Sequence, residues 1–220
     1  MAKIVPVKPL LIQLYGFPGS GKTYFARQLC DHIQAAHVQG DRIRHELFEN
    51  PRYDKQENDV IAQLMDYMTE EFLSAGISVI YDTNAQRYAQ RHALREMSRK
   101  AHAQPLLIWL QVDADSSYLR TTQRDRRRSD DKYAEPLDRS TFNDVASRMQ
   151  NPQTTEDYVV ISGKHVFKTQ FSAVMKKLHE LNLISADEVV NKVTKPGMVT
   201  LVPNHTADRV DMTRRNIMIR

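Results

Sequence analysis

Residues 16–23 read GFPGSGKT and directly follow the apolar run LLIQLY at residues 10–15. They match the pattern Gly-x-x-x-x-Gly-Lys-Thr, in which backbone amides turn inward around phosphate oxygens; a Cβ would block both that conformation and the close approach. The apolar run predicts a buried strand, and the residues after Thr23 have helical periodicity. A chance glycine turn rarely has this strand-loop-helix context, so the stretch predicts a nucleotide triphosphate site.

Each part of this loop has an expected task. Lys22 has the length to reach the β and γ phosphates, and the Thr23 hydroxyl suits Mg²⁺. The helix that follows directs its partial positive end at the same phosphates. ATP and Mg²⁺ are therefore the expected cofactors. The residues predicted to bind the nucleotide are Gly16, Pro18, Gly19, Ser20, Gly21, Lys22, Thr23 and Tyr24.

The overall composition limits the class of protein. The chain has 220 residues and a net charge of +4, since 31 basic residues face 27 acidic ones. This length suits one sizeable α/β domain with an appendage, and the charge favours polyanionic partners only weakly.

The single cysteine, Cys30, excludes an internal disulfide and is typical of a reducing compartment. No stretch approaches the roughly 18 to 20 apolar residues of a membrane span. We therefore expect a cytoplasmic protein without a membrane partner, and the sequence leaves its oligomeric state open.

Apolar and amphipathic segments alternate along the chain, a pattern typical of βα units and a mostly parallel sheet. The predicted fold is a three-layer α/β/α domain of the P-loop NTPase type over residues 1–184. Residues 185–220 are predicted to form a small β appendage, because short β-branched runs surround Pro196-Gly197, a pair that suits a type II turn. Strands are predicted at 10–15, 36–39, 77–81, 106–112 and 158–161, and helices at 23–34, 42–48, 54–75, 86–103, 115–128, 141–149 and 167–181.

A second group of candidate residues follows the second predicted strand. Ligands collect at the carboxyl ends of parallel strands, so Asp41 should share an edge with the phosphate loop. Its carboxylate is suited to accept the proton of an attacking hydroxyl, while Arg44, on the same helical face, holds a phosphate or the acceptor. The alternative is an aspartate that caps a helix beside a surface arginine.

A third group ends the apolar strand of VIYDTN, residues 79–84. Asp82 in this position suits the orientation of Mg²⁺ or its waters. Thr83 and Asn84 are candidates for contacting the acceptor. They are equally suited to cap the next helix.

The combination of GFPGSGKT, Asp41 with Arg44, and the strand ending in Asp-Thr-Asn resembles the polynucleotide-kinase-type branch of the P-loop kinases, a group that includes AAA-domain and zeta-toxin-like ATP-dependent kinases. The resemblance covers about residues 10–182. It implies that Lys22 and Thr23 handle phosphate and Mg²⁺, that Asp41 is the general base, that Arg44 binds the acceptor and that Asp82 supports the metal site. Relatives phosphorylate nucleic acid 5′-hydroxyls, sugars, antibiotics and nucleotide sugars, so the acceptor stays open.

Five arginines gather near the end of the helix predicted at 115–128: Arg120, Arg124, Arg126, Arg127 and Arg128. In the family that it resembles, this region, about residues 120–140, is a lid whose arginines stabilise charge on the transferred phosphoryl group. We expect Arg124 and either Arg127 or Arg128 to act in this way. The spacing does not choose between the last two.

A further series of arginines is spaced by four along the helix after the Asp-Thr-Asn motif: Arg87, Arg91, Arg95 and Arg99. One interpretation is a track for the phosphates of a polynucleotide. The other is an ordinary exposed helix face. Arg91 lies nearest the catalytic edge and is the member predicted to contact the acceptor.

The function predicted from the sequence is an ATP-dependent kinase with a hydroxyl acceptor. A polynucleotide 5′-hydroxyl is the preferred acceptor, because of the resemblance, the basic series and the net charge. The alternatives are a kinase of small molecules, such as a metabolite, a sugar or an antibiotic, and a non-catalytic module that binds ATP.

Overall fold

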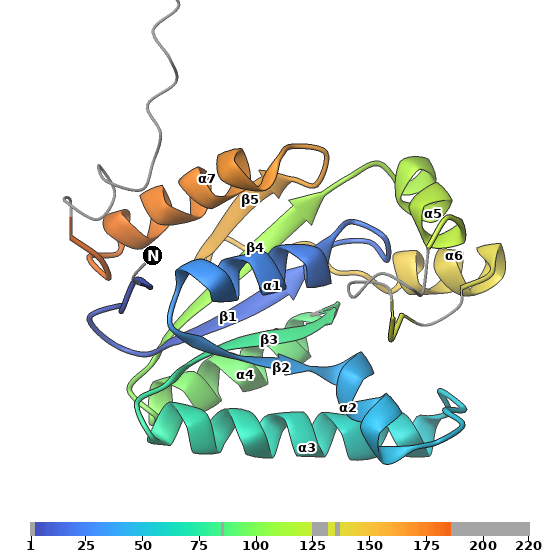
Figure 1. Ribbon diagram of the computed structural model, residues 1–220, viewed down its shortest axis with the longest axis horizontal. Coiled ribbons are helices and arrows are strands. Elements are labelled where there is room, and N and C mark those ends of the chain that lie inside the picture. The colour runs from blue at the N-terminus through green and yellow to red at the C-terminus, as the bar shows by residue number, and fades with distance from the viewer. Residues whose placement is uncertain (1–2, 85, 125–131, 135–136, 186–220) are drawn as a thin grey trace, which may run out of the picture.

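The computed structural model describes residues 3–84, 86–124, 132–134 and 137–185 (Figure 1). The predicted appendage therefore lies outside the described residues except for Ser185. Five strands form one sheet in the order β2-β3-β1-β4-β5, and all neighbouring strands are parallel. This confirms the predicted three-layer α/β/α fold. The strands are β1 (Leu10–Tyr15), β2 (Ala35–Gln39), β3 (Ser78–Asn84), β4 (Gln104–Gln111) and β5 (Tyr158–Ser162).

The helices occupy the places predicted from the periodicity, with small shifts at most ends. The exception is the helix predicted at 115–128, which ends at Thr122 with Gln123 as its C-cap. The helices are α1 (Lys22–His32), α2 (Gly40–Leu47), α3 (Lys55–Ser74), α4 (Tyr88–Lys100), α5 (Ala114–Thr122), α6 (Arg139–Ser147) and α7 (Phe167–Glu180). One boundary matters for the site. The helix predicted from residue 86 begins at Tyr88 and β3 continues to Asn84, so Thr83 and Asn84 belong to the strand. The N-cap of α4 is Arg87, so the expectation that Thr83 or Asn84 caps this helix is wrong.

Helices cover both faces of the sheet (Figure 1), and an apolar layer lies between each face and its helices. On one face, alternate residues of β1, such as Ile12 and Leu14, pack with Phe25 of α1 and Val174 of α7. On the other face, Leu11 and its neighbours in β3 pack with side chains of α3 and α4. Successive side chains of a strand point to opposite faces, so one buried strand supplies both layers. Helices α5 and α6 lie beyond the carboxyl ends of the strands, beside the phosphate loop.

Local signals explain the ends of α3. Asp54 is its N-cap, and the Asp54 carboxylate accepts a hydrogen bond from the backbone N–H of Glu57 at 2.9 Å. The Glu57 side chain does not complete a reciprocal capping box, because it accepts bonds from the backbone N–H groups of Arg52 and Tyr53. Gly76, with φ of +77°, follows the last turn and allows the chain to leave the helix. Across the described residues, no helix combines the length and apolar character needed to cross a bilayer.

Candidate active site

The phosphate loop joins β1 to α1 and depends on glycine at defined points. Gly19 has φ of +82°, and a Cβ there would collide with the carbonyl oxygen of Ser117 in α5. Gly21 has φ of +96° and is the N-cap of α1, and the space on its Cβ side is open. The backbone therefore turns tightly against α5 on one side and leaves the amino end of α1 accessible on the other. This is the geometry that an anionic ligand needs at a helix N-terminus.

Lys22 folds back over the loop. Its Nζ donates hydrogen bonds to the carbonyl oxygens of Gly16 and Phe17, both at 2.9 Å. Burial lowers the pKa of Lys22 to about 8, an effect that Asp82 opposes and Arg124 reinforces. The ammonium group is thus held at the cavity by two carbonyl oxygens, which are neutral acceptors. A strong anion would bind it better, because charge-assisted hydrogen bonds are about twice as strong as neutral ones.

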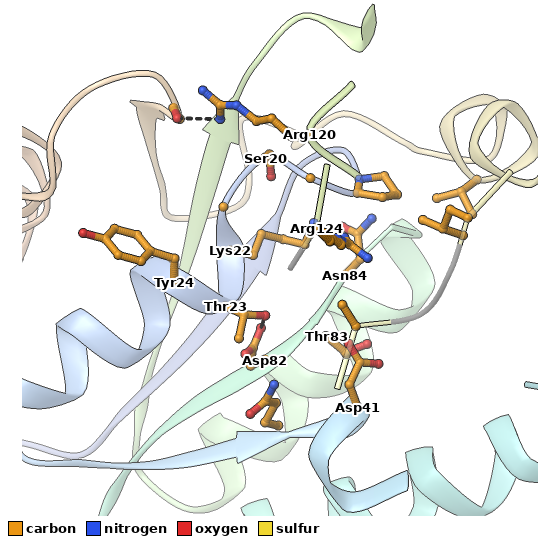
Figure 2. Close-up of a pocket in the computed structure, with 18 of the residues that line it drawn as sticks. Ser20, Lys22, Thr23, Tyr24, Asp41, Asp82, Thr83, Asn84, Arg120 and Arg124 are labelled. Atoms are coloured by element: carbon orange, nitrogen blue, oxygen red, sulfur yellow. Dashed lines mark hydrogen bonds between the residues drawn. The ribbon is translucent and has the colours of Figure 1, made fainter. Parts of the chain in front are cut away.

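Asp82 ends the buried part of β3 and lies beside α1. Its Oδ1 is 3.3 Å from Oγ1 of Thr23, and the two side chains face each other in Figure 2. Its Oδ2 accepts a hydrogen bond from Nε2 of His37 in the neighbouring strand β2, at 2.9 Å. Only 3% of the Asp82 side chain is exposed. A hydroxyl and a carboxylate oxygen are the hard donors that Mg²⁺ prefers, so the residues present fit the predicted ion.

Asp41 lies in the first turn of α2 and lines the same cavity as Lys22 and Asp82 (Figure 2). Burial, with the nearby Asp82 carboxylate, raises the pKa of Asp41 to about 6, although Arg124, Arg44 and Lys22 oppose the shift. The N-cap of α2 is Gln39 and makes no side-chain capping bond. The alternative in which Asp41 is a helix cap is therefore wrong. Its carboxylate is left to face the cavity.

The cavity has a volume of about 560 Å³ and extends from the phosphate loop to α6 and the loop after β5. The lining includes Ser20 and Asn84, each of which has a buried side-chain donor without a hydrogen-bond partner among the described residues. Asn84 also links the motifs, since its Oδ1 is 3.4 Å from the backbone N of Gly16. Buried donors are normally paired, so these two favour an anionic or polar ligand. The predicted nucleotide-binding residues in the lining are Pro18, Gly19, Ser20, Gly21, Lys22, Thr23 and Tyr24; Gly16 lies at the start of the same loop.

The predicted lid is described only in part. Arg120 and Arg124 line the cavity, and Arg120 donates a hydrogen bond to the carbonyl oxygen of Gly163 at 2.9 Å (Figure 2). Arg127 and Arg128 lie outside the described residues. The described piece of the lid reaches α2, because the ring of Tyr133 packs on that of His45 at 5.6 Å between centroids.

Arg44 does not take the position predicted for it. Its guanidinium donates a hydrogen bond to Oε2 of Glu57 at 2.9 Å, contacts Asn58 and lies 4.7 Å from the centre of the Tyr53 ring. It is buried and is not part of the cavity lining. The alternative of a surface arginine is wrong as well. The packing of α2 on α3 is the physical reason, since it places the guanidinium beside the buried Glu57 carboxylate, and buried charges are normally paired.

Arg91 is also withdrawn from the surface. It is fully buried, and its Nε donates to Oε1 of Glu156 at 2.8 Å. Arg95 is buried too, with Nη1 3.0 Å from the same oxygen of Glu156. Both interpretations of the arginine series therefore fail at these two positions. A buried side chain neither belongs to an exposed helix face nor offers its guanidinium to the phosphates of a polynucleotide. Arg99 is exposed, as expected for a surface residue.

Three functional or structural partners were not found by reasoning from the sequence: His37, Glu57 and Glu156. His37 shares a face of β2 with Gln39, but only the pairing of β2 with β3 brings it to Asp82. Glu57 was assigned to a capping box, and its ion pair depends on how α2 packs on α3. Glu156 precedes β5 in a polar loop that carries no periodic signal. A sequence gives side-chain periodicity, and strand order is needed to bring these groups together.

The comparisons with known proteins bear on the family and the fold. A family model described as "AAA domain" matches residues 11–152, more than half of the chain. A comparison with curated proteins gave no match. A sugar kinase from Janibacter sp. is similar in structure, with a TM-score of 0.57 at 15% identity, over 83% of this chain and 98% of that one.

Two further solved structures share the fold. The APS kinase CysC of Mycobacterium tuberculosis, in complex with AMPPNP and APS, has a TM-score of 0.54 at 16% identity, over 78% of this chain and 98% of that one. A chain of the Pnkp1/Rnl/Hen1 RNA repair complex has a TM-score of 0.53 at 17% identity, over 64% of this chain and 44% of that one. At these identities the likeness shows the fold. The family match over residues 11–152 shows that the chain belongs to the AAA-domain family.

Proposed function

We propose that the protein is an ATP-dependent kinase that transfers the γ-phosphoryl group to a hydroxyl, with Asp41 as the general base. The observation that carries the proposal is the position of Asp41, whose carboxylate lines the same cavity as Lys22 of the phosphate loop. Its pKa of about 6 is closer to neutrality than that of an ordinary aspartate. A base works best when its pKa lies near the operating pH.

The proposed transfer is an in-line displacement. The acceptor oxygen forms a bond to the γ-phosphorus, the bond from that phosphorus to the bridging oxygen breaks, and the acceptor proton moves to Asp41. ADP leaves with the electron pair of the broken bond. Lys22 exchanges the carbonyls of Gly16 and Phe17 for phosphate oxygens. Arg124 from the cavity wall, with Arg127 or Arg128 from the lid, stabilises the charge that spreads over the phosphoryl oxygens.

Thr23 and Asp82 are the residues that would hold Mg²⁺. The ion would neutralise charge on the β and γ phosphates when it is bound with the nucleotide. The chain's own contribution is to fix the two oxygens, which lie 3.3 Å apart at the foot of the cavity. Ser20 and Asn84 add two unpaired donors to the same lining.

The acceptor that the described part of the cavity favours is a small molecule with a hydroxyl group. The lining beyond the phosphate loop offers the hydroxyl of Thr83, the amides of Asn84 and Gln86, and the apolar side chains of Leu137 and Val145. Amides and hydroxyls suit a sugar-like or other polar hydroxyl compound. The two arginines predicted to hold the acceptor, Arg44 and Arg91, instead lie against Glu57 and Glu156. The likeness to a sugar kinase over nearly all of its length agrees with this choice.

A polynucleotide 5′-hydroxyl is the second candidate. The likeness to a chain of an RNA repair complex and the net charge of +4 support it. A nucleic acid brings a phosphate next to its terminal nucleoside, so this acceptor needs a cation beside the cavity, and Arg120 and Arg124 in the lining could supply it. The candidates differ in charge and size, and a transfer assay separates them.

The test is transfer of labelled phosphate from ATP, screened over hydroxyl-bearing metabolites, 5′-hydroxyl DNA and 5′-hydroxyl RNA. Asp41→Asn should reduce transfer by about 10² to 10⁴-fold while leaving the affinity for a non-hydrolysable ATP analogue within about twofold. Arg99→Met, on an exposed face, is the matched control and should transfer at the wild-type rate. Analogue binding without transfer to any acceptor would contradict the proposal and leave a non-catalytic module that binds ATP. A fully active Asp41→Asn variant would exclude Asp41 as the general base and leave a kinase with another base.

A further inference from the structure

The contact between His37 and Asp82 has no place in the transfer described above. The two residues lie on neighbouring parallel strands, β2 and β3, where Gln39 pairs with Asp82 and His37 pairs with Ile80. The side chain of His37 is 20% exposed, and the Asp82 side chain is 3% exposed. A carboxylate accepts hydrogen bonds only, so Nε2 of His37 is the donor in their 2.9 Å contact.

The two oxygens of Asp82 therefore have different partners. Oδ2 is bonded to His37, and Oδ1 lies 3.3 Å from the Thr23 hydroxyl. The terminal torsion of an aspartate is broad and nearly twofold, so the strand alone does not decide which oxygen faces Thr23. The contact with Thr23 is long for an O–H···O bond and is too weak to decide it. The shorter bond from His37 is charge-assisted and stronger, and it selects the orientation.

We propose that His37 is a positioning residue: it holds the Asp82 carboxylate with Oδ1 toward Thr23, ready to bind Mg²⁺ together with the nucleotide. The inference rests on the proposed function, because it assigns Thr23 and Asp82 to the metal. The imidazole does not bind the ion itself, since its Nε2 is occupied by Oδ2. Groups that orient metal ligands in this way typically change metal affinity by about 10 to 100-fold when they are removed.

Metal affinity is the direct test, and it does not require turnover. Mn²⁺, which is visible by electron paramagnetic resonance, serves as the probe with AMPPNP bound, and Mg²⁺ competes for it. His37→Leu removes the donor and should weaken Mn²⁺ binding about 10 to 100-fold, while AMPPNP binding without metal stays unchanged. His37→Gln keeps an N–H at a similar reach and should restore most of the affinity. Asp82→Ala, which removes both carboxylate oxygens, sets the scale for a fully disabled site.

The outcomes separate this inference from the function that it rests on. If wild-type protein binds AMPPNP with Mn²⁺ and His37→Leu binds the metal equally well, His37 does not position Asp82 and the inference is wrong. It is also wrong if His37→Gln is as impaired as His37→Leu, because the hydrogen bond is then not the reason. If the wild-type protein binds neither nucleotide nor metal, the proposed function itself fails. Should His37→Leu not fold, the comparison of His37→Gln with His37→Asn, whose shorter amide stops one atom earlier, decides in the same way.

Discussion

Two groups of cations lie within the same fold and have different surroundings. Lys22, Arg120 and Arg124 line the cavity at the carboxyl ends of the strands. Arg44, Arg91 and Arg95 are buried against two carboxylates, Glu57 and Glu156, away from that cavity. We call these the cavity cations and the buried cations. The comparison teaches that helical spacing brings an arginine to the edge of a site, and that the nearest buried carboxylate then decides whether it faces the ligand or the core.

The largest expected effect follows from removing a cavity cation. Lys22→Ala should lower phosphoryl transfer by about 10³-fold or more, because the group that meets the β and γ phosphates is lost. Its unfolding temperature should stay the same or rise, because burial already lowers the pKa of Lys22 to about 8. Steady-state transfer and thermal unfolding measure the two quantities. A variant that is unstable but still catalytic would place Lys22 among the buried cations instead.

The next largest effect concerns a buried cation. Arg91→Met should lower the free energy of unfolding by up to about 3 to 5 kcal/mol, because the buried Glu156 loses its two-point partner and keeps Arg95 as its remaining cation. Chemical denaturation measures this change. Transfer by the folded fraction should remain near the wild-type rate. The triple variant Arg91→Met, Arg95→Met and Glu156→Leu should recover much of the loss, since apolar side chains can replace a buried ion group once no charge is left without its partner.

Arg99→Met is the matched control for this prediction, since Arg99 lies on the same helix in an exposed pair with Glu96. It should cost less than about 1 kcal/mol. The same variants also test the polynucleotide track. If Arg91→Met has the same free energy of unfolding as the wild type and binds an oligonucleotide more weakly, Arg91 contacts the nucleic acid and does not stabilise the core.

A smaller effect is expected on stability at Asp41. The pKa of this carboxyl is raised from 3.8 to about 6, so its ionised form destabilises the folded state above pH 6. Asp41→Asn should therefore be more stable than the wild type by about 1 to 3 kcal/mol at pH 7.5. The difference should shrink as the pH falls through 6 toward 4, and it should vanish below about pH 3, where the carboxyl is protonated in both states. Denaturation at the two pH values checks the sign, and a destabilised variant would contradict it.

The smallest predicted change is in the pH profile of the wild type. Transfer needs Asp41 ionised and Lys22 protonated, so kcat/KM should fall about tenfold per pH unit below 6 and should also fall above about 8. Kinetics from pH 5 to 9 with saturating Mg²⁺ measure both limbs. Arg99→Met should give the same profile. A flat acid limb down to pH 5 would exclude Asp41 as the base.

Much of the fold was predictable because it depends on patterns local in the chain. The apolar run before residue 16 and the helical periodicity after Thr23 give β1 and α1, and the glycines of the loop fix the turn between them. The alternation of strands and helices implies a parallel sheet, and the five strands of the structure confirm it. Capping and glycine signals located both ends of α3 to within a residue.

The assignment of side chains to the cavity or to the core was not predictable in the same way. Asp41 and Arg44 are three residues apart on one helix, yet Asp41 faces the cavity and Arg44 faces Glu57. Arg91, Arg95 and Arg99 are evenly spaced by four residues along one helix. The first two are buried in ion pairs with Glu156, whereas Arg99 is exposed.

By itself, then, the sequence determined the phosphate loop, the order of the elements and the edge at which ligands gather, because backbone geometry and periodicity are properties of short segments. The tertiary structure decided which charges meet across that edge and which are neutralised beneath it. Electrostatic energy depends on distance in space and on burial, so His37, Glu57 and Glu156 acquire their partners only when strands and loops far apart in the chain are packed together.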